Sequence, residues 1–109
     1  MRRFDQRRNP RTAHARHILI ATKPKAIEIL DEIRESKRPF KSFKKLAKRY
    51  STCPSGTKGG DLGEFIEGQM AQAFEEGVWA AEPEEPPTTF HKSQFGYHII
   101  WVHWVRMQP

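Results

Sequence analysis

The chain has 109 residues, enough for one domain with a single hydrophobic core. It contains no run of about 18 apolar residues, so the sequence predicts no membrane-spanning helix and no membrane partner. The single cysteine excludes an internal disulfide and the paired-cysteine zinc motifs.

The net charge of +6 is concentrated near the N-terminus. Residues 1–16 hold six arginines and one aspartate, a net +5, so the remaining 93 residues are close to neutral. We interpret residues 1–13 as a flexible basic arm and residues 14–109 as the folded domain. Weak, salt-sensitive binding of nucleic acid or another polyanion is the alternative role of the arm. The arm lacks the apolar stretch of a secretory signal, which together with the lone cysteine favours the cytoplasm.

The first half of the domain predicts one strand followed by two helices. The apolar run Ile18–Ile20, within residues 14–21, is typical of a buried strand. Apolar residues three apart predict a helix over residues 25–37. A second helix over residues 41–50 has its apolar side chains on one face and lysines on the other.

The second half predicts two strands separated by a short helix and a rigid connection. The expected elements are a strand over 62–66, a short helix within 68–78, an acidic proline-rich surface segment over 82–87, and a central strand over 97–106. This order indicates a compact α+β domain, with an antiparallel sheet and helices packed around it.

The stretch from Ser51 to Phe74 combines chemical features that the rest of the chain lacks. It contains the only cysteine, four glycines within residues 56–63, and large apolar side chains directly after them. Glycines permit positive φ angles and close approach of the backbone to other atoms. A polar loop that carries one thiol beside an adaptable apolar patch predicts a small peptide-binding pocket.

Three segments of the chain together resemble the parvulin-type peptidyl-prolyl cis/trans isomerases. They are HILI at residues 17–20, STCPSGTKGGDLGEF at residues 51–65 and FGYHII at residues 95–100, with Gly68, Gln69, Met70 and Phe74 adding to the match. Each segment alone is a weak signal, but their order and spacing make a strong one over residues 14–105.

The resemblance implies a four-stranded antiparallel sheet surrounded by about four helices. It also implies two groups of functional residues. The catalytic group is His17, Cys53, Ser93 and His98, and the residues that would hold the substrate proline are Leu62, Gln69, Met70 and Phe74. The segment before the last strand is about one residue longer than in many relatives, so the register at Ser93 is the part most open to revision.

Several roles are open for Cys53 and the two histidines. The thiol could be a nucleophile, a metal ligand together with His17 and His98, a plain buried thiol, or a polar group that tunes the site. The last role is favoured, because no hydrolase signature surrounds Cys53. The histidines could take part in the reaction or could be structural residues that orient the site, and only one of two adjacent imidazoles readily carries a charge.

The resemblance implies that the chain accelerates rotation about X–Pro bonds in peptides and in flexible or unfolded protein segments. We expect no metal, no cofactor and a monomer. The segment after the first strand, residues 22–25, is short and has no arginine, so we expect no preference for phosphorylated residues before proline. A non-catalytic peptide-binding or chaperone module on the same scaffold is the alternative function.

Overall fold

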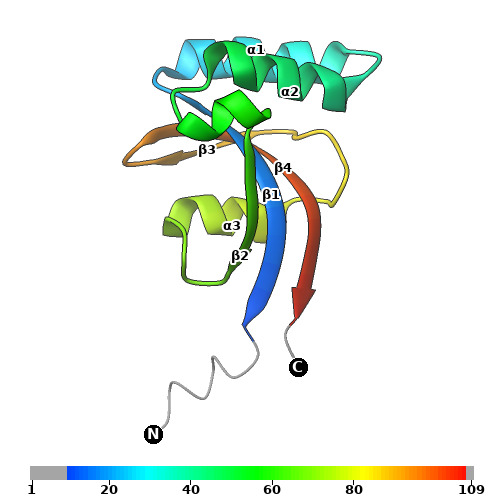
Figure 1. Cartoon of the computed structure of the whole chain (residues 1–109). Coiled ribbons are helices and arrows are strands. Elements are labelled where there is room, and N and C mark those ends of the chain that lie inside the picture. The colour runs from blue at the N-terminus through cyan, green and yellow to red at the C-terminus, as the bar shows by residue number, and fades with distance from the viewer. Residues whose placement is uncertain (1–9, 108–109) are drawn as a thin grey trace, which may run out of the picture.

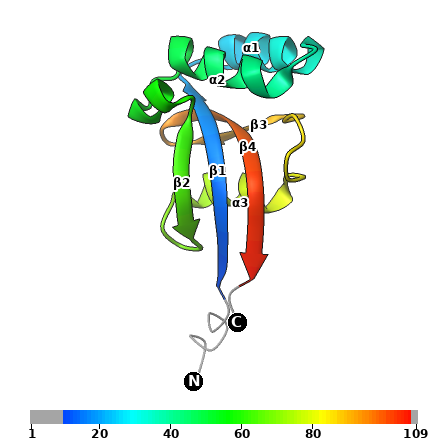
Figure 2. The same ribbon diagram turned by 45° about the vertical axis from the view of Figure 1, so that its right-hand side comes forward.

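A computed structural model describes residues 10–107 of the chain (Figure 1). Four antiparallel strands form one sheet in the order β2-β1-β4-β3. The two long strands, β1 (Arg11–Ile20) and β4 (Gly96–Met107), lie in the centre. The edges are β2 (Asp61–Ile66) and the shorter β3 (Phe90–Ser93), and Figure 2 shows β2, β1 and β4 side by side. The expected α+β fold with a four-stranded antiparallel sheet is confirmed.

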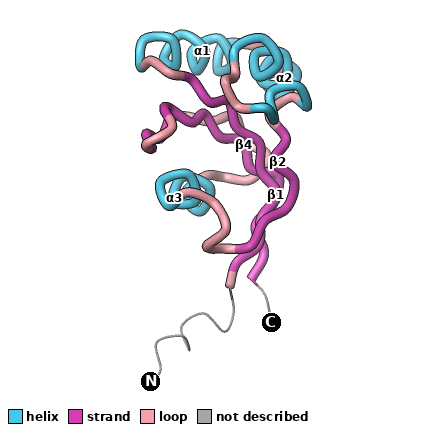
Figure 3. The backbone as a smooth tube through the Cα atoms, turned by 60° about the vertical axis from the view of Figure 1, so that its left-hand side comes forward, coloured by secondary structure: helices cyan, strands magenta, loops and turns pink. Residues whose placement is uncertain are grey.

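Helices pack against both faces of the sheet. The helices α1 (Lys23–Glu35) and α2 (Pro39–Tyr50) lie together on one face, and α3 (Gln72–Ala80) lies on the other (Figure 3). A short 3₁₀ helix, η2 (Pro54–Lys58), connects α2 to β2. The described residues therefore form three α-helices and one 3₁₀ helix, where the resemblance implied about four helices.

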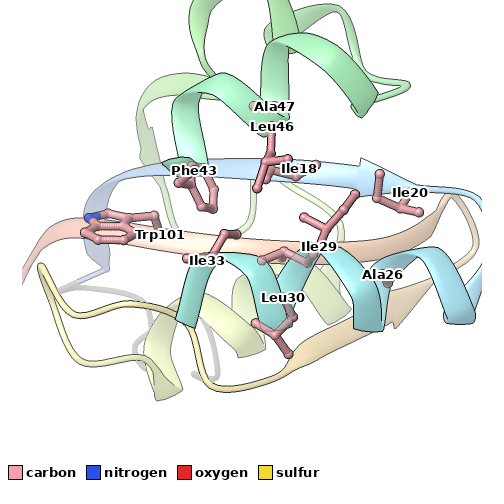
Figure 4. Close-up of a cluster of buried hydrophobic side chains, with 11 residues drawn as sticks. Ile18, Ile20, Ala26, Ile29, Leu30, Ile33, Phe43, Leu46, Ala47 and Trp101 are labelled. Atoms are coloured by element: carbon pink, nitrogen blue, oxygen red, sulfur yellow. The ribbon is translucent and has the colours of Figure 1, made fainter. Parts of the chain in front are cut away.

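The two-residue period of the central strands builds a separate core on each face. Ile18 and Ile99 point toward α1 and α2, where Phe43 and Trp101 complete the cluster shown in Figure 4. The alternate side chains face α3 and form the second core, which consists of Ala13, Ala15, Phe65, Phe74, Val78, Ile100 and Val102. The same alternation places functional side chains on the α3 face.

The first strand begins earlier than the sequence predicts. β1 starts at Arg11, three residues before the expected domain boundary at residue 14, so the expected arm overlaps the strand by three residues. Ala13 is completely buried, and Arg11 donates hydrogen bonds to the Glu67 carboxylate. Small side chains such as alanine give little hydrophobic signal in a sequence even where they pack tightly. The flexibility predicted for the rest of the arm concerns residues outside those described.

The other predicted elements agree with the structure to within a few residues, apart from β3, whose bounds the sequence analysis did not give. The predicted helix within residues 68–78 begins later, at Gln72, and ends at Ala80. Within residues 10–107, no helix has the length and apolar character needed to cross a membrane.

Candidate active site

Two buried histidines form the centre of the site on the α3 face of the sheet. His17 on β1 is paired in register with Ile100 on β4, so His98, two residues earlier on β4, lies diagonally across from it on the same face. The Nδ1 atoms of the two rings are 2.9 Å apart, and the rings stack with their centroids separated by 5.0 Å. His17 is 5% exposed and His98 3% exposed.

Burial keeps both imidazoles neutral near pH 7. Desolvation, with a smaller contribution from the neighbouring His98, lowers the pKa of His17 to about 4. Desolvation, with a smaller contribution from His91, also lowers the pKa of His98. Because the hydrogen bond between the two Nδ1 atoms uses one proton, one ring carries its proton on Nδ1 and the other presents a lone pair there.

Ser93 extends this hydrogen-bonded pair to a third strand. Its Oγ lies 2.6 Å from Nε2 of His98 and accepts a hydrogen bond from the backbone N–H of Phe95 at 3.1 Å. The predicted register at Ser93 therefore brings the hydroxyl to the histidines. At the other end of the row, Nε2 of His17 is buried and has no hydrogen-bond partner among the described residues.

The three predicted apolar pocket residues belong to one cluster, and one of them, Phe74, lies beside the histidine rings. Phe74 on α3 is buried, and its ring centroid lies 5.4 Å from that of His17 and 5.6 Å from that of His98. Leu62 on β2 and Met70 in the turn before α3 are half-buried and pack against the same cluster. These side chains come from three separate parts of the chain, so they come together only when the domain folds.

A buried carboxylate that the sequence analysis did not single out fixes the turn that carries Met70. Glu75, on the first turn of α3, is 6% exposed. It accepts hydrogen bonds from the backbone N–H of Gly68, at 2.9 and 3.0 Å, and from that of Met70, at 2.8 Å. The sequence does not mark this glutamate as buried, because a glutamate in the first turn of a helix is usually exposed.

The Gln69 side chain has a local role in the same turn. Its Oε1 accepts a hydrogen bond from the backbone N–H of Ile66 at 2.7 Å, and the residue is exposed. The amide thus closes the turn between β2 and α3. Its predicted contact with substrate stays a prediction.

Cys53 lies at the start of η2 on a turn that is tied to the end of β1. The Ser51 hydroxyl accepts hydrogen bonds from the backbone N–H groups of Leu19 and Cys53, and the N–H of Thr52 donates to the Leu19 carbonyl. The half-buried thiol accepts a hydrogen bond from the Ser55 hydroxyl at 3.2 Å. Among the described residues, no three histidine, cysteine or acidic side chains are arranged as ligands for one metal ion.

The glycine-rich loop is fixed to the histidine strand through its backbone. The carbonyl of Gly60 accepts a hydrogen bond from the N–H of His17 at 3.0 Å. Gly60 has a φ of +85°, and a Cβ there would lie 2.4 Å from the His17 carbonyl oxygen, so only glycine fits. Arg16 supports the loop from the other face by donating to the carbonyls of Lys58 and Gly59. The sequence analysis did not identify this arginine.

A separate cavity of about 380 Å³ lies between α3 and the segment that leads to β3. Its lining includes Gly77, Pro87, His91 and Ile100, but none of the eight predicted site residues. We place the candidate site at the histidine pair, which Ser93 and the ring of Phe74 both contact.

The comparisons with known proteins agree with this geometry. The family model of the PPIC-type peptidyl-prolyl isomerase (PPIase) domain matches residues 1–105. The chain belongs to this family, the parvulins.

Relatives of this parvulin domain include longer proteins. It is 41% identical over 87 residues to the foldase protein PrsA of Bacillus subtilis, an alignment that covers 79% of this chain and 28% of PrsA. It is similar to the crystal structure of PrsA from Bacillus anthracis, with a TM-score of 0.84, 31% identity, and coverage of 96% of this chain and 46% of that one. The chain thus spans under a third of the length of the curated relative.

A smaller relative has nearly the same extent as this domain. The parvulin NmPin of Nitrosopumilus maritimus is 32% identical, with a TM-score of 0.71 and coverage of 85% of this chain and 96% of that one. The parvulin fold expected from the sequence is therefore confirmed at the level of family and architecture.

Proposed function

We propose that this parvulin domain catalyses cis/trans isomerisation of X–Pro bonds in peptides and in flexible polypeptide segments. Rotation about such a bond has a barrier of about 18–20 kcal/mol, which arises from amide resonance. Without a catalyst the rotation takes tens to hundreds of seconds. The reaction makes and breaks no covalent bond, so it needs neither a cofactor nor a nucleophile.

An enzyme accelerates this rotation by binding the twisted amide more tightly than the planar one. In the twisted state the carbonyl is less polar and the nitrogen is more basic than in the planar amide. The apolar group of Leu62, Met70 and Phe74 suits a proline ring, and the neutral histidine pair adds fixed dipoles beside it. A site that excludes water strengthens each of these interactions.

One observation carries the proposal. A neutral, buried histidine pair lies against the ring of Phe74, and Phe74 shares a cluster with Leu62 and Met70, the two half-buried apolar side chains that we expect, from the family resemblance, to hold the proline. Leu62 and Met70 in this cluster remain partly open to solvent. A histidine pair with a purely structural role would not need such a partly open apolar cluster beside it.

The test is proline isomerisation of a short Ala-Pro peptide, followed by NMR exchange spectroscopy. We expect the wild-type domain to accelerate the exchange, and we expect the half-buried Met70→Ala variant to raise KM with a smaller effect on kcat. Binding of the peptide without acceleration would overturn the proposal and favour the non-catalytic peptide-binding module.

A further inference from the structure

One segment of the chain, which includes α2, carries charge of one sign only. Residues 36–60 contain eight lysines and arginines and no aspartate or glutamate. These residues, which we call the basic face, are Lys37, Arg38, Lys41, Lys44, Lys45, Lys48, Arg49 and Lys58. The net charge of the chain does not reveal this face, because acidic residues elsewhere offset its positive charge. They include Glu28, Asp31, Glu32 and Glu35 on α1.

Helical geometry directs most of these charges outward. Residues on an α-helix are about 100° apart, so Lys41, Lys45 and Lys48 lie on one side of α2. Phe43 and Leu46 are buried on the opposite side. The three lysines are exposed, as are Lys37, Arg38, Arg49 and Lys58.

The charges of the basic face are unpaired within residues 10–107. The ion pairs between described residues lie elsewhere, for example between Lys25 and Glu28 on α1. On the basic face, Lys44 lies over the ring of Phe40 at 4.6 Å and Arg49 lies over that of Tyr50 at 5.2 Å. No acidic side chain of the neighbouring α1 forms an ion pair with α2 among the described residues.

The basic face reaches the loop that is hydrogen-bonded to the strand carrying His17. The Lys44 side chain lies against Gly59, and Lys58 ends the 3₁₀ helix that begins after Cys53. Two residues after Lys58, the backbone carbonyl of Gly60 accepts a hydrogen bond from the N–H of His17. Figure 1 shows α2 passing directly into η2 and then into β2. A polypeptide that extends past this loop to the α2 side of the sheet therefore meets positive charge.

We propose that the basic face docks acidic stretches of the polypeptides that the domain isomerises. Polypeptides with aspartate and glutamate near their prolines are then the preferred substrate class. This proposal rests on the proposed function. Charge complementarity across an open surface accelerates association and lowers KM, and it weakens with salt.

The composition of the face favours a polypeptide over a nucleic acid. Six of its eight cations are lysines, which act as mobile point charges and lack the planar fork of arginine that fits phosphate. The aromatic residues of α2 are buried or half-buried, so they offer no open platform for stacked bases. Dispersed carboxylates on a flexible chain match such lysines well.

The experiment compares flexible peptides of about 20 residues, which reach beyond the pocket at about 3.3 Å per residue. Each peptide has one central Ala-Pro bond and a flanking block of either glutamates or glutamines, placed before the proline in one pair and after it in a second pair. The domain variants are the triple substitution Lys41→Gln, Lys45→Gln and Lys48→Gln, and a control with the same loss of charge, Lys23→Gln, Lys92→Gln and Arg106→Gln. Glutamine is a good helix former, so the α2 variant should fold.

At low salt, we expect the wild-type domain to favour the glutamate peptide of at least one pair by about tenfold in kcat/KM, because KM is lower for that peptide. This preference should disappear as the salt concentration rises. The α2 variant should lose the preference while it turns over the glutamine peptides at the wild-type rate, and the control variant should keep the preference.

Three results would overturn the proposal. The first is equal turnover of both peptides in each pair by the wild-type domain. The second is an unchanged glutamate preference in the α2 variant. The third is an α2 variant that loses binding to a DNA duplex or to anionic vesicles but keeps its glutamate preference. Failure of the proposed function differs from all of these, because the wild-type domain would then isomerise none of the peptides. In that case, equal affinity of the wild-type domain for the glutamate and glutamine peptides of each pair would also overturn the proposed docking of acidic stretches on the basic face.

Discussion

The carboxylate of Glu75 accepts a hydrogen bond from the backbone N–H of Met70 at 2.8 Å, so a helix residue sets the position of a pocket residue that lies in the preceding turn. The same carboxylate binds the N–H of Gly68. Without it, the turn would have two unpaired donors close to the core.

We predict that Glu75→Ala destabilises the domain by about 2–4 kcal/mol, because it leaves two part-buried donors without their partner and removes packed atoms of a buried side chain. KM for a short Ala-Pro peptide should rise severalfold as Met70 shifts. Glu76→Ala is the matched control, since Glu76 is the next residue on the same helix and is exposed. Urea unfolding and peptide kinetics check the prediction, which fails if the two variants behave alike.

Gly60 and Gly63 allow a second matched comparison. Both have positive φ angles, +85° and +73°, so alanine is strained at each. An added Cβ meets the His17 carbonyl at Gly60 but meets nothing within 4 Å at Gly63. We expect Gly63→Ala to cost about 1 kcal/mol of stability and Gly60→Ala more than about 3 kcal/mol, with a loss of isomerase activity. Similar costs measured by urea unfolding would show that the loop can move away from His17.

The buried histidines make stability depend on pH. The pKa of His17 falls from 6.5 in the unfolded chain to about 4 in the folded domain, so acid favours the unfolded state, which binds the proton more tightly. Stability is complete above pH about 6.5 and decreases as the pH falls toward about 4, by roughly 3 kcal/mol for this residue. His98, whose pKa is also lowered, acts in the same direction.

The check is urea unfolding of the wild-type domain and of His17→Gln between pH 7 and pH about 5.5, above the range in which most carboxylates titrate. The variant should show a shallower decrease in unfolding free energy. Equal slopes would mean that His17 is not held neutral by the fold.

Cys53 should act through its polarity. Because its Sγ accepts a hydrogen bond from the Ser55 hydroxyl, an aspartate oxygen could accept the same bond. We therefore expect Cys53→Asp to keep much of the isomerase activity and Cys53→Ala to lose some of it. A nucleophilic role predicts that both variants are inactive. Mass spectrometry of the domain during turnover would reveal a covalent adduct, which would refute the expectation.

Short peptides with a phosphorylated residue before proline should not be favoured by more than about tenfold. After β1 the chain enters α1 at Lys23 within two residues, and the nearby Lys25 is already engaged by Glu28 at 3.0 Å. Short Ala-Pro, Leu-Pro, Glu-Pro and phosphoSer-Pro peptides without acidic flanks provide the comparison in kcat/KM. An advantage of about a hundredfold that survives added salt would indicate a preorganised phosphate site.

The parts of the fold that the sequence predicted well have large apolar residues at regular spacing. The helix α2 and the strand β4 are clear for this reason, since both bury their aromatic and β-branched residues on defined faces. The start of β1 and all of β3 are harder to recognise. Ala13 and Ala15 have little apolar surface, and Phe90–Ser93 contains four residues of which three are polar.

The candidate site was predicted through its family pattern, and its supports were not. The histidine pair, Ser93 and the apolar pocket residues come together as expected. Arg16 and Glu75 were missed because charged residues are usually solvated, and their partners are backbone groups that no sequence pattern marks. The lysines of α2 were recognised as one side of a helix, but the larger basic face was not, because the charge of residues 17–109 was summed together rather than over residues 36–60 alone.

The pairing of Arg11 with Met107 brings the two ends of the sheet's central strands within one strand spacing of each other, at the end of the molecule seen at the bottom of Figure 1. A stretching force applied across these two residues would therefore load the hydrogen bonds between β1 and β4 one after another instead of all together. The domain should peel open at low force from that end. The backbone hydrogen bonds next to the His17–Ile100 pair would break only after those from Arg11 to Arg16 had broken.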